Sequence, residues 1–423
     1  MDKRIMSVRL LYLLLLSASI AWAERPLELD FNLDSKVSDN AIKHKNQVYS
    51  ERQDTATLSI LADHENAWSK IEADYRNSWY WYAKDSQQQQ RRLMGRGRLL
   101  LGSDNSRVGL RLSHSIEETL DKANKTDLLK NKNQRQISRA APYIKLRLSK
   151  VDNFTLSADI ADIKYPDDSD RNSQREGGSL QWQHRLSHTD GFNIDAALSD
   201  ISFDQFTGAG YRYESANFSY FSQLRQFSYQ LLAGVNRYQT DGQESNSQPL
   251  YELTLGYRAA RNIFNLRLGQ RYSDSSQGNN NDVGFDSGSV GSSSRDLDIY
   301  ERNFGRLTWT FLPVLERLET TFFAEYERES YENLSDNNSR EKGYGLVFRY
   351  KLDRSNSLSL RFDSRSNMFE REEKDFVIQR ASVRYVHPLA SGINLNAYWN
   401  YEQRNNSDIY TEQQLGVRAS YRY

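Results

Sequence analysis

The chain has 423 residues and a formal net charge of zero, with 56 basic and 56 acidic residues and no cysteine. These values argue against nucleic-acid binding, which requires a basic excess, and exclude disulfide frameworks, thiolate metal sites and thiol catalysis. The mean hydropathy of −0.80 is low, yet 12% of the residues are aromatic, which disordered chains do not show.

The first residues, 1–23, have the features of a signal peptide. Lys3 and Arg4 precede an apolar run at 10–21 that is too short to span a membrane comfortably. Ala21-Trp22-Ala23 fits the small-x-small cleavage rule, so we expect a mature chain of residues 24–423. The alternative is an uncleaved anchor. No later stretch is apolar enough for a membrane-spanning helix.

From residue 27 onward, apolar and polar residues alternate along many short segments. This period of two is the pattern of β-strands with one apolar and one polar face. Roughly twenty residues for each strand with its connection gives about 20 strands, with about 16 to 22 as the range. The clearest such segments lie at 27–33, 144–148, 154–160, 192–198, 251–257, 264–268, 344–350 and 358–362.

Short and long connections alternate between these segments. Turn-forming Asn, Asp and Gly mark the short ones, since these residues tolerate positive φ. Barrels in outer membranes have short periplasmic turns and long outer loops, so we expect both chain ends in the periplasm. Leucines within 117–132 also suggest a short loop helix. The expected short turns are at 63–66, 102–105, 150–153, 188–191, 261–262, 353–356 and 388–392; the expected long loops are at 36–54, 118–138, 166–176, 241–249 and 275–296.

The last strand alternates most strictly, and we expect it to close a barrel that the assembly machinery recognises. Its apolar face consists of Leu415, Val417, Ala419, Tyr421 and Tyr423. Aromatic residues also gather where strands end, as in membrane-interface girdles. These are Tyr75, Trp79, Trp81, Tyr398, Trp399 and Tyr401.

The sequence therefore predicts an all-β fold: a single transmembrane antiparallel up-and-down barrel in a Gram-negative outer membrane, in contact with its lipid and without a plug domain. A transmembrane barrel also explains the low hydropathy, because only every second strand residue faces lipid. A soluble β-sandwich or propeller is the competing fold, since its strands alternate too.

Many charged residues lie opposite the apolar positions, where a barrel has its lumen. Four of them, Arg349, Arg361, Arg384 and Arg418, are candidate lumen-lining residues. One interpretation is a hydrated wall in which opposite charges pair. The other is a basic stripe that contacts the hydroxyls or carboxylates of a passing polymer.

Catalytic motifs are weak throughout the chain. The chain has six histidines and no H-E-x-x-H motif. His184 and His188 are four residues apart, but they fall on an expected strand and its turn, where helical metal geometry does not apply. His114 with Ser115 is a weak candidate for a catalytic pair. We therefore predict no enzyme, no catalytic residues, no cofactor and no metal site.

The order of the strands resembles a family of uncharacterised outer-membrane barrels associated with PEP-CTERM/exosortase and exopolysaccharide gene clusters. The resemblance covers nearly all of the mature chain and implies a role in secreting or assembling surface polysaccharide, with periplasmic export components as partners. It supplies no catalytic residues. The segments that carry it are Val37-Ser38-Asp39-Asn40, residues 54–59, residues 142–148 and residues 304–313.

Exopolysaccharide export or assembly is accordingly the first function we expect. Three alternatives remain open: a general diffusion or uptake porin, a barrel enzyme acting on lipid or polysaccharide, and a structural surface protein with a closed lumen. The porin would be favoured by an inward-folded constriction loop, for which 275–296 is the candidate segment.

Overall fold

The computed structural model places most of the chain downstream of the expected signal peptide. The signal peptide, its cleavage site and the candidate constriction loop at 275–296 lie outside the described residues. The description covers residues 27–423 except 47, 104–105, 121–124, 168, 205–209, 241–243, 275–298, 314–316, 333–334, 371–373 and 391.

The described chain forms twenty strands. They are β1 (Leu27–Ser38), β2 (Glu51–Glu65), β3 (Ser69–Tyr82), β4 (Gln90–Leu101), β5 (Val108–Leu120), β6 (Lys132–Arg147), β7 (Asp152–Lys164), β8 (Ser173–Arg185), β9 (Asp190–Phe203), β10 (Tyr211–Gln223), β11 (Phe227–Thr240), β12 (Asn246–Arg258), β13 (Asn262–Asp274), β14 (Ile299–Phe311), β15 (Leu318–Tyr331), β16 (Ser339–Lys351), β17 (Ser357–Phe369), β18 (Phe376–Ala390), β19 (Ile393–Asn406) and β20 (Tyr410–Arg422).

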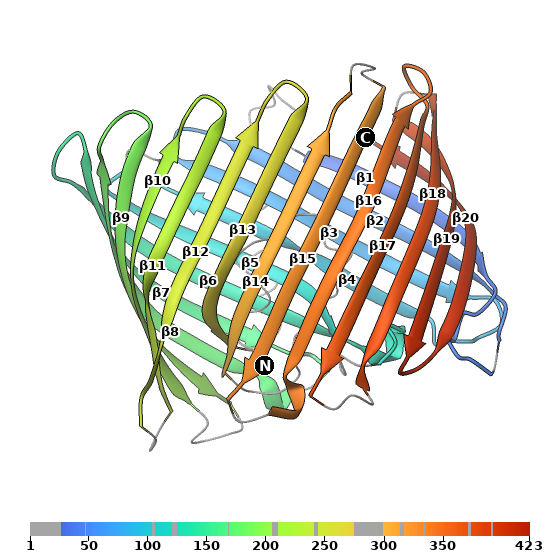
Figure 1. The fold of residues 1–423 in the computed structure, drawn as a ribbon, viewed down its shortest axis with the longest axis horizontal. Coiled ribbons are helices and arrows are strands. Elements are labelled where there is room, and N and C mark those ends of the chain that lie inside the picture. The colour runs from blue at the N-terminus through green and yellow to red at the C-terminus, as the bar shows by residue number, and fades with distance from the viewer. Residues whose placement is uncertain are drawn as a thin grey trace, which may run out of the picture.

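Each strand pairs antiparallel with the next along the chain, and β20 pairs with β1. The sheet therefore closes on itself into a single barrel of tilted strands (Figure 1). The predicted up-and-down barrel and its strand number are both confirmed. Closure leaves no unpaired sheet edge at the β1–β20 junction, where Asp30 pairs with Arg422 and Ser38 with Gln414. No helix in the described part of the chain is long and apolar enough to cross a membrane.

The outer surface is apolar because alternation points every second side chain away from the lumen. In β1, Leu27, Leu29, Phe31 and Leu33 are each 36–49% exposed. The paired positions on β20 continue the same face with Val417 and others. A folded protein in water does not expose so continuous an apolar surface, whereas lipid requires it.

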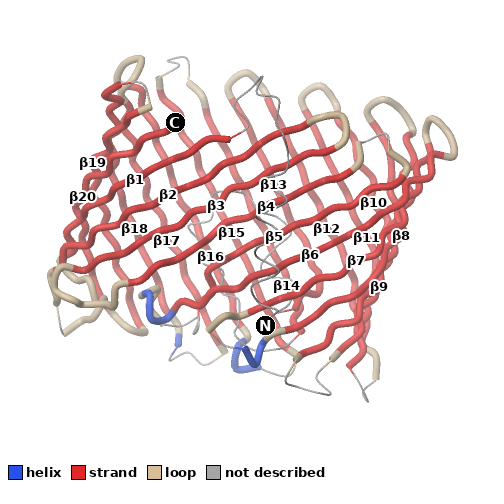
Figure 2. The backbone as a smooth tube through the Cα atoms, turned by 180° about the vertical axis from the view of Figure 1, so that it is seen from behind, coloured by secondary structure: helices blue, strands red, loops and turns tan. Residues whose placement is uncertain are grey.

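The two rims of the barrel differ. At one rim, here called the turn end, strands are joined by short turns, and the C-terminus lies there (Figure 1). At the other rim, called the loop end, most connections are longer, and the short 3₁₀ turns lie there (Figure 2). The alternation of short and long connections follows the sequence prediction, whereas the side of the membrane that each rim faces stays a prediction.

Strands at the loop end run further than the sequence suggested. The expected loops at 36–54 and 118–138 are wrong at their margins, because Lys36, Asp54 and Glu118 lie within β1, β2 and β5. The cause is that both faces of these strand ends are polar. Arg52 and Asp54 form an ion pair on the outer face, so alternation disappears although the ladder continues.

Three other expectations need correction. Among the described residues of 117–132, the expected helix is limited to one 3₁₀ turn, Leu129–Asn131, because residues 117–120 extend β5 and pair with β6. The turn at 224–226 was missed because Leu-Arg-Gln carries none of the residues that signal turns. Tyr398 was assigned to an aromatic girdle, yet it faces the lumen, where its hydroxyl donates a hydrogen bond to Asp34.

Candidate functional site in the barrel interior

The inner wall is lined by ion pairs that join neighbouring strands. Arg267 of β13 contacts Glu252 of β12 at 2.7 Å, and Arg302 of β14 contacts Glu327 of β15 at 2.7 Å. Both arginines use two nitrogens, which is the geometry that best matches a carboxylate. The inner wall therefore presents both signs of charge at close spacing instead of a field of one sign.

Arg418 illustrates how tightly such pairs are built. Its guanidinium lies 2.6 Å from the carboxylate of Asp34 on β1, across the seam that closes the barrel. The same carboxylate accepts a hydrogen bond from Tyr398 at 2.5 Å. Tyr398 reaches it by lying across Gly416, where an added Cβ would come within 2.4 Å of the tyrosine ring. A side chain at 416 would therefore displace the tyrosine and weaken this junction.

The other three predicted lumen residues lie on the neighbouring strands β16, β17 and β18. Arg349 contacts Glu319 at 2.7 Å, and Arg361 contacts Asp363 at 2.8 Å. Arg384 lies opposite Tyr398 in the strand register and has no ion pair with any described carboxylate. The register thus gathers the four arginines in one quarter of the inner wall, but three of them have acidic partners.

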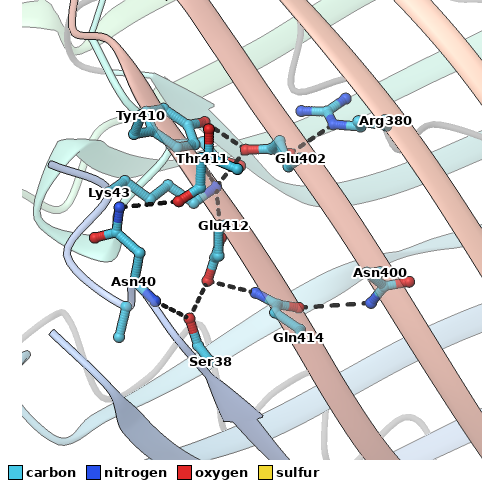
Figure 3. A network of polar contacts seen from close by, with 12 residues as sticks. Ser38, Asn40, Lys43, Arg380, Asn400, Glu402, Tyr410, Thr411, Glu412 and Gln414 are labelled. Atoms are coloured by element: carbon cyan, nitrogen blue, oxygen red, sulfur yellow. Dashed lines mark hydrogen bonds and ion pairs between the residues drawn. The ribbon is translucent and has the colours of Figure 1, made fainter. Parts of the chain in front are cut away.

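A polar cluster at the loop end is centred on Lys43, in the connection between β1 and β2 (Figure 3). The ammonium group of Lys43 lies 2.6 Å from Asp127, 2.7 Å from Glu402 and 3.6 Å from Glu412. Its side chain is only 11% exposed. We call Lys43, Asp127, Glu402 and Glu412 the mouth cluster. It joins two loops to the inner wall formed by β19 and β20.

Hydrogen bonds from side chains hold the Lys43 loop in this position. Asn40 donates its side-chain amide to the carbonyls of His44 and Thr411, and Ser38 donates its hydroxyl to Glu412 at 2.6 Å. Figure 3 shows these groups meeting against β19 and β20. The loop is therefore fixed at several points.

A second loop, between β5 and β6, contacts the same cluster. It supplies Asp127, and its Lys125 lies 3.3 Å from Asp408 in the β19–β20 connection. The main-chain amide of Leu129 donates to Gln87, whose side chain in turn donates to the carbonyl of Ala41. Connections from four hairpins therefore converge on one side of the mouth.

In the mouth cluster, each charged group favours the charged form of its oppositely charged neighbour. Burial alone would lower the pKa of Lys43, but the carboxylates of Asp127 and Glu402 outweigh it and raise this pKa well above its usual value. Burial would raise the pKa of Asp127, yet Lys43 lowers it overall. Both groups therefore stay charged across the neutral range, and the contact between loop and wall is ionic there.

Catalytic or metal-binding geometry does not emerge from the described residues. His114 accepts or donates a hydrogen bond with the hydroxyl of Tyr75 at 2.8 Å. Its neighbour Ser115 points to the opposite face of β5, since successive strand residues alternate. Within the described ranges, no group of three or more His, Asp or Glu residues could hold a metal ion.

Sequence reasoning missed the mouth cluster. Lys43 and Asp127 lie in polar loops whose composition resembles that of any solvated loop. Glu402 and Glu412 carry a signal, because they alternate with outward residues on the last two strands and must face the lumen. Nothing in the local sequence says which loop supplies their cation.

Comparisons with known proteins reveal no close relative. No family model matches the sequence, and neither does any curated protein. Among solved structures, the chain is similar to the FrpB iron transporter from Neisseria meningitidis (F3-3 variant), with a TM-score of 0.45, 9% identity, and coverage of 94% of this chain and 81% of that one.

Two further solved structures match as well. For the outer membrane protein opdK from Pseudomonas aeruginosa, the TM-score is 0.41 at 9% identity, over 94% of this chain and 99% of that one. For a BenF-like porin from Pseudomonas fluorescens Pf-5, the TM-score is 0.42 at 10% identity, over 94% of this chain and 98% of that one. These low scores and identities do not indicate a function for this chain.

Proposed function

We propose that this protein is an outer-membrane channel through which small hydrophilic solutes diffuse. The observation that carries the proposal is the combination of a closed twenty-stranded barrel with an apolar exterior and a charged, polar interior. Barrels of 16 to 18 strands leave an aqueous channel in porins, and this barrel has more strands. The described residues form strands and their connections, with no separate plug.

The mixed charges of the inner wall support a weakly selective channel. Each arginine paired with a carboxylate attracts anions less than a free one, because the neighbouring negative charge cancels its field. The mouth cluster, with one ammonium group and three carboxylates, adds negative charge on one side of the loop end. Swelling of liposomes that contain the barrel, in sugars of increasing size, tests the proposal.

Polysaccharide export remains a second hypothesis, and one observation favours it. The inner faces of β8 and β9 carry amides, including Gln181 and Asn193, that suit hydrogen bonding to sugar hydroxyls. This wall lies apart from the four arginines on β16 to β20. A sugar polymer would then contact amides on one side and arginines on the other.

Replacing Arg349, Arg361, Arg384 and Arg418 together with glutamine separates the two hypotheses. The barrel should still fold, because Arg349, Arg361 and Arg418 are half-exposed and glutamine keeps a hydrogen-bond donor for their carboxylate partners. Asp34, Glu319 and Asp363 lose their partners, so the reversal potential in a planar bilayer should shift toward cation preference. Polysaccharide secretion should fall only if export is the function.

The matched control replaces the acidic partners instead, as Asp34→Asn, Glu319→Gln and Asp363→Asn. Its reversal potential should shift in the opposite direction, toward anions. Equal reversal potentials for wild type and both variants would mean that these groups do not face the conducting path.

A further inference from the structure

An aromatic row crosses five neighbouring strands on the outer surface. Phe227 of β11 lies opposite Tyr257 of β12, which lies opposite Phe264 of β13; Trp309 of β14 and Phe322 of β15 continue the row. These strands lie side by side in Figure 1. Together with Asn262 and Leu307 the row lines an open groove of about 590 Å³.

The groove begins at the turn end and runs away from it. Phe227 is the first residue of β11, whereas Phe322 lies well inside β15, so the row moves further from the rim with each strand. With strands about 4.8 Å apart, it extends for roughly 19 Å. The groove is thus long, narrow and apolar, which suits an extended acyl chain better than a compact ligand.

Two arginines flank the rim end of the groove. Arg225 and Arg261 are exposed in the turns before β11 and β13, and neither pairs with a described carboxylate. The adjoining backbone is fixed, because the amide of Arg258 donates to the carbonyl of Gln226 and that of Leu312 to the carbonyl of Arg261. Two guanidinium groups beside an apolar groove can bind a phosphate group by ion pairs and hydrogen bonds.

We propose that this groove binds a phospholipid of the membrane leaflet at the turn end, with one acyl chain along the aromatic row and the phosphate at Arg225 and Arg261. The inference rests on the proposed outer-membrane location but not on channel activity. A second copy of this chain fits less well, because docking another barrel there would bring its basic turns toward these arginines.

The proposal is tested by native mass spectrometry of the delipidated full-length barrel in detergent, titrated with phosphatidylglycerol, with diacylglycerol of the same chains, and with lipid A. The double variant Arg225→Gln, Arg261→Gln should bind phosphatidylglycerol about tenfold more weakly than wild type. Its binding of diacylglycerol should be unchanged. Phe264→Ala should weaken the binding of both.

The matched control removes two positive charges from turns away from the groove, as Lys150→Gln and Arg354→Gln, and should bind phosphatidylglycerol as wild type does. Equal phosphatidylglycerol affinity of the two double variants would overturn the proposal, as would a preference for lipid A. Barrel dimers that Phe264→Ala abolishes would assign the groove to a second copy. Channel activity should be normal in all of these variants. If the wild type and the variants alike lack channel activity, the proposed channel function fails while the lipid proposal stands.

Discussion

Deleting residues 421–423 should prevent the barrel from inserting into the membrane. These residues form the end of the β20 ladder on β1, where the amide of Tyr423 donates to the carbonyl of Leu29 at 2.9 Å and Arg422 contacts Asp30 at 2.8 Å. They also carry two outward aromatic side chains. Without them, β1 has an exposed edge at membrane depth, which lipid does not tolerate.

The measurement is gel migration with and without heating, together with membrane fractionation and protease sensitivity. The truncated chain should be protease-sensitive and should show no heat-modifiable band. The control is Tyr421→Phe with Tyr423→Phe, which keeps both rings and the backbone ladder and should insert normally. Normal insertion of the truncated chain would contradict this view of closure.

Replacing Lys43 with methionine should release the loops from the mouth of the barrel. The change leaves Asp127, Glu402 and Glu412 close together without their shared cation. Removing one partner of a buried ion pair costs on the order of 3 kcal/mol. We expect residues 39–50 and 125–131 to exchange amide hydrogens faster by more than tenfold, while the strands keep their protection.

Lys125 offers the matched control, since it lies in the same region but is 48% exposed and, among the described residues, pairs with Asp408 alone. Lys125→Met should cost about 0–1 kcal/mol and leave the exchange of both loops nearly unchanged. Similar exchange in the two variants would show that the mouth cluster does not hold the loops.

The same cluster predicts how loop exchange depends on pH. Because the pKa of Asp127 is lowered in the folded chain, its contribution is present above the unfolded value of about 3.9 and is lost as pH falls through the lowered value. The pKa of Lys43 is raised, so its contribution is present below about 10.4 and is lost only as pH rises through the raised value. After correction for intrinsic exchange, loop protection should therefore be flat between about pH 5 and 9.

The strands were predictable because one face of each must contact lipid. This requirement imposes the alternation at Leu27, Leu29, Phe31 and Leu33, and it recurs wherever a strand crosses the membrane. Toward the loop end, as at Arg52 and Asp54, the outer face carries charged residues and the alternation ends there. The strand number was therefore predictable to within a few strands, while the loop-end boundaries were not.

Turns were predictable where a side chain builds them. Asp353 accepts hydrogen bonds from the amides of Ser355 and Asn356 at 2.8 and 2.7 Å, which is why an Asp at this place indicates a turn. The turn at 224–226 has no such side chain, and only the pairing of its flanking strands reveals it.

The sequence predicts which residues face the barrel interior, but it does not predict which of them contact one another. Alternation alone assigns Arg349, Arg361, Arg384 and Arg418 to the lumen. Their acidic partners depend on strand register, and Asp34 lies far from Arg418 in sequence while facing it across the closing seam. The mouth cluster depends in addition on how loops fold back, which no periodic pattern encodes.

Swelling of liposomes that contain the purified barrel tests the channel claim most directly. The account predicts swelling in glucose, slower swelling in sucrose and slower still in raffinose, because an open aqueous path admits small solutes fastest. Liposomes prepared with the chain lacking residues 421–423 serve as the control. If the inserted wild-type barrel swells liposomes no faster than that control in any of the three sugars, the lumen is closed and the channel claim is contradicted.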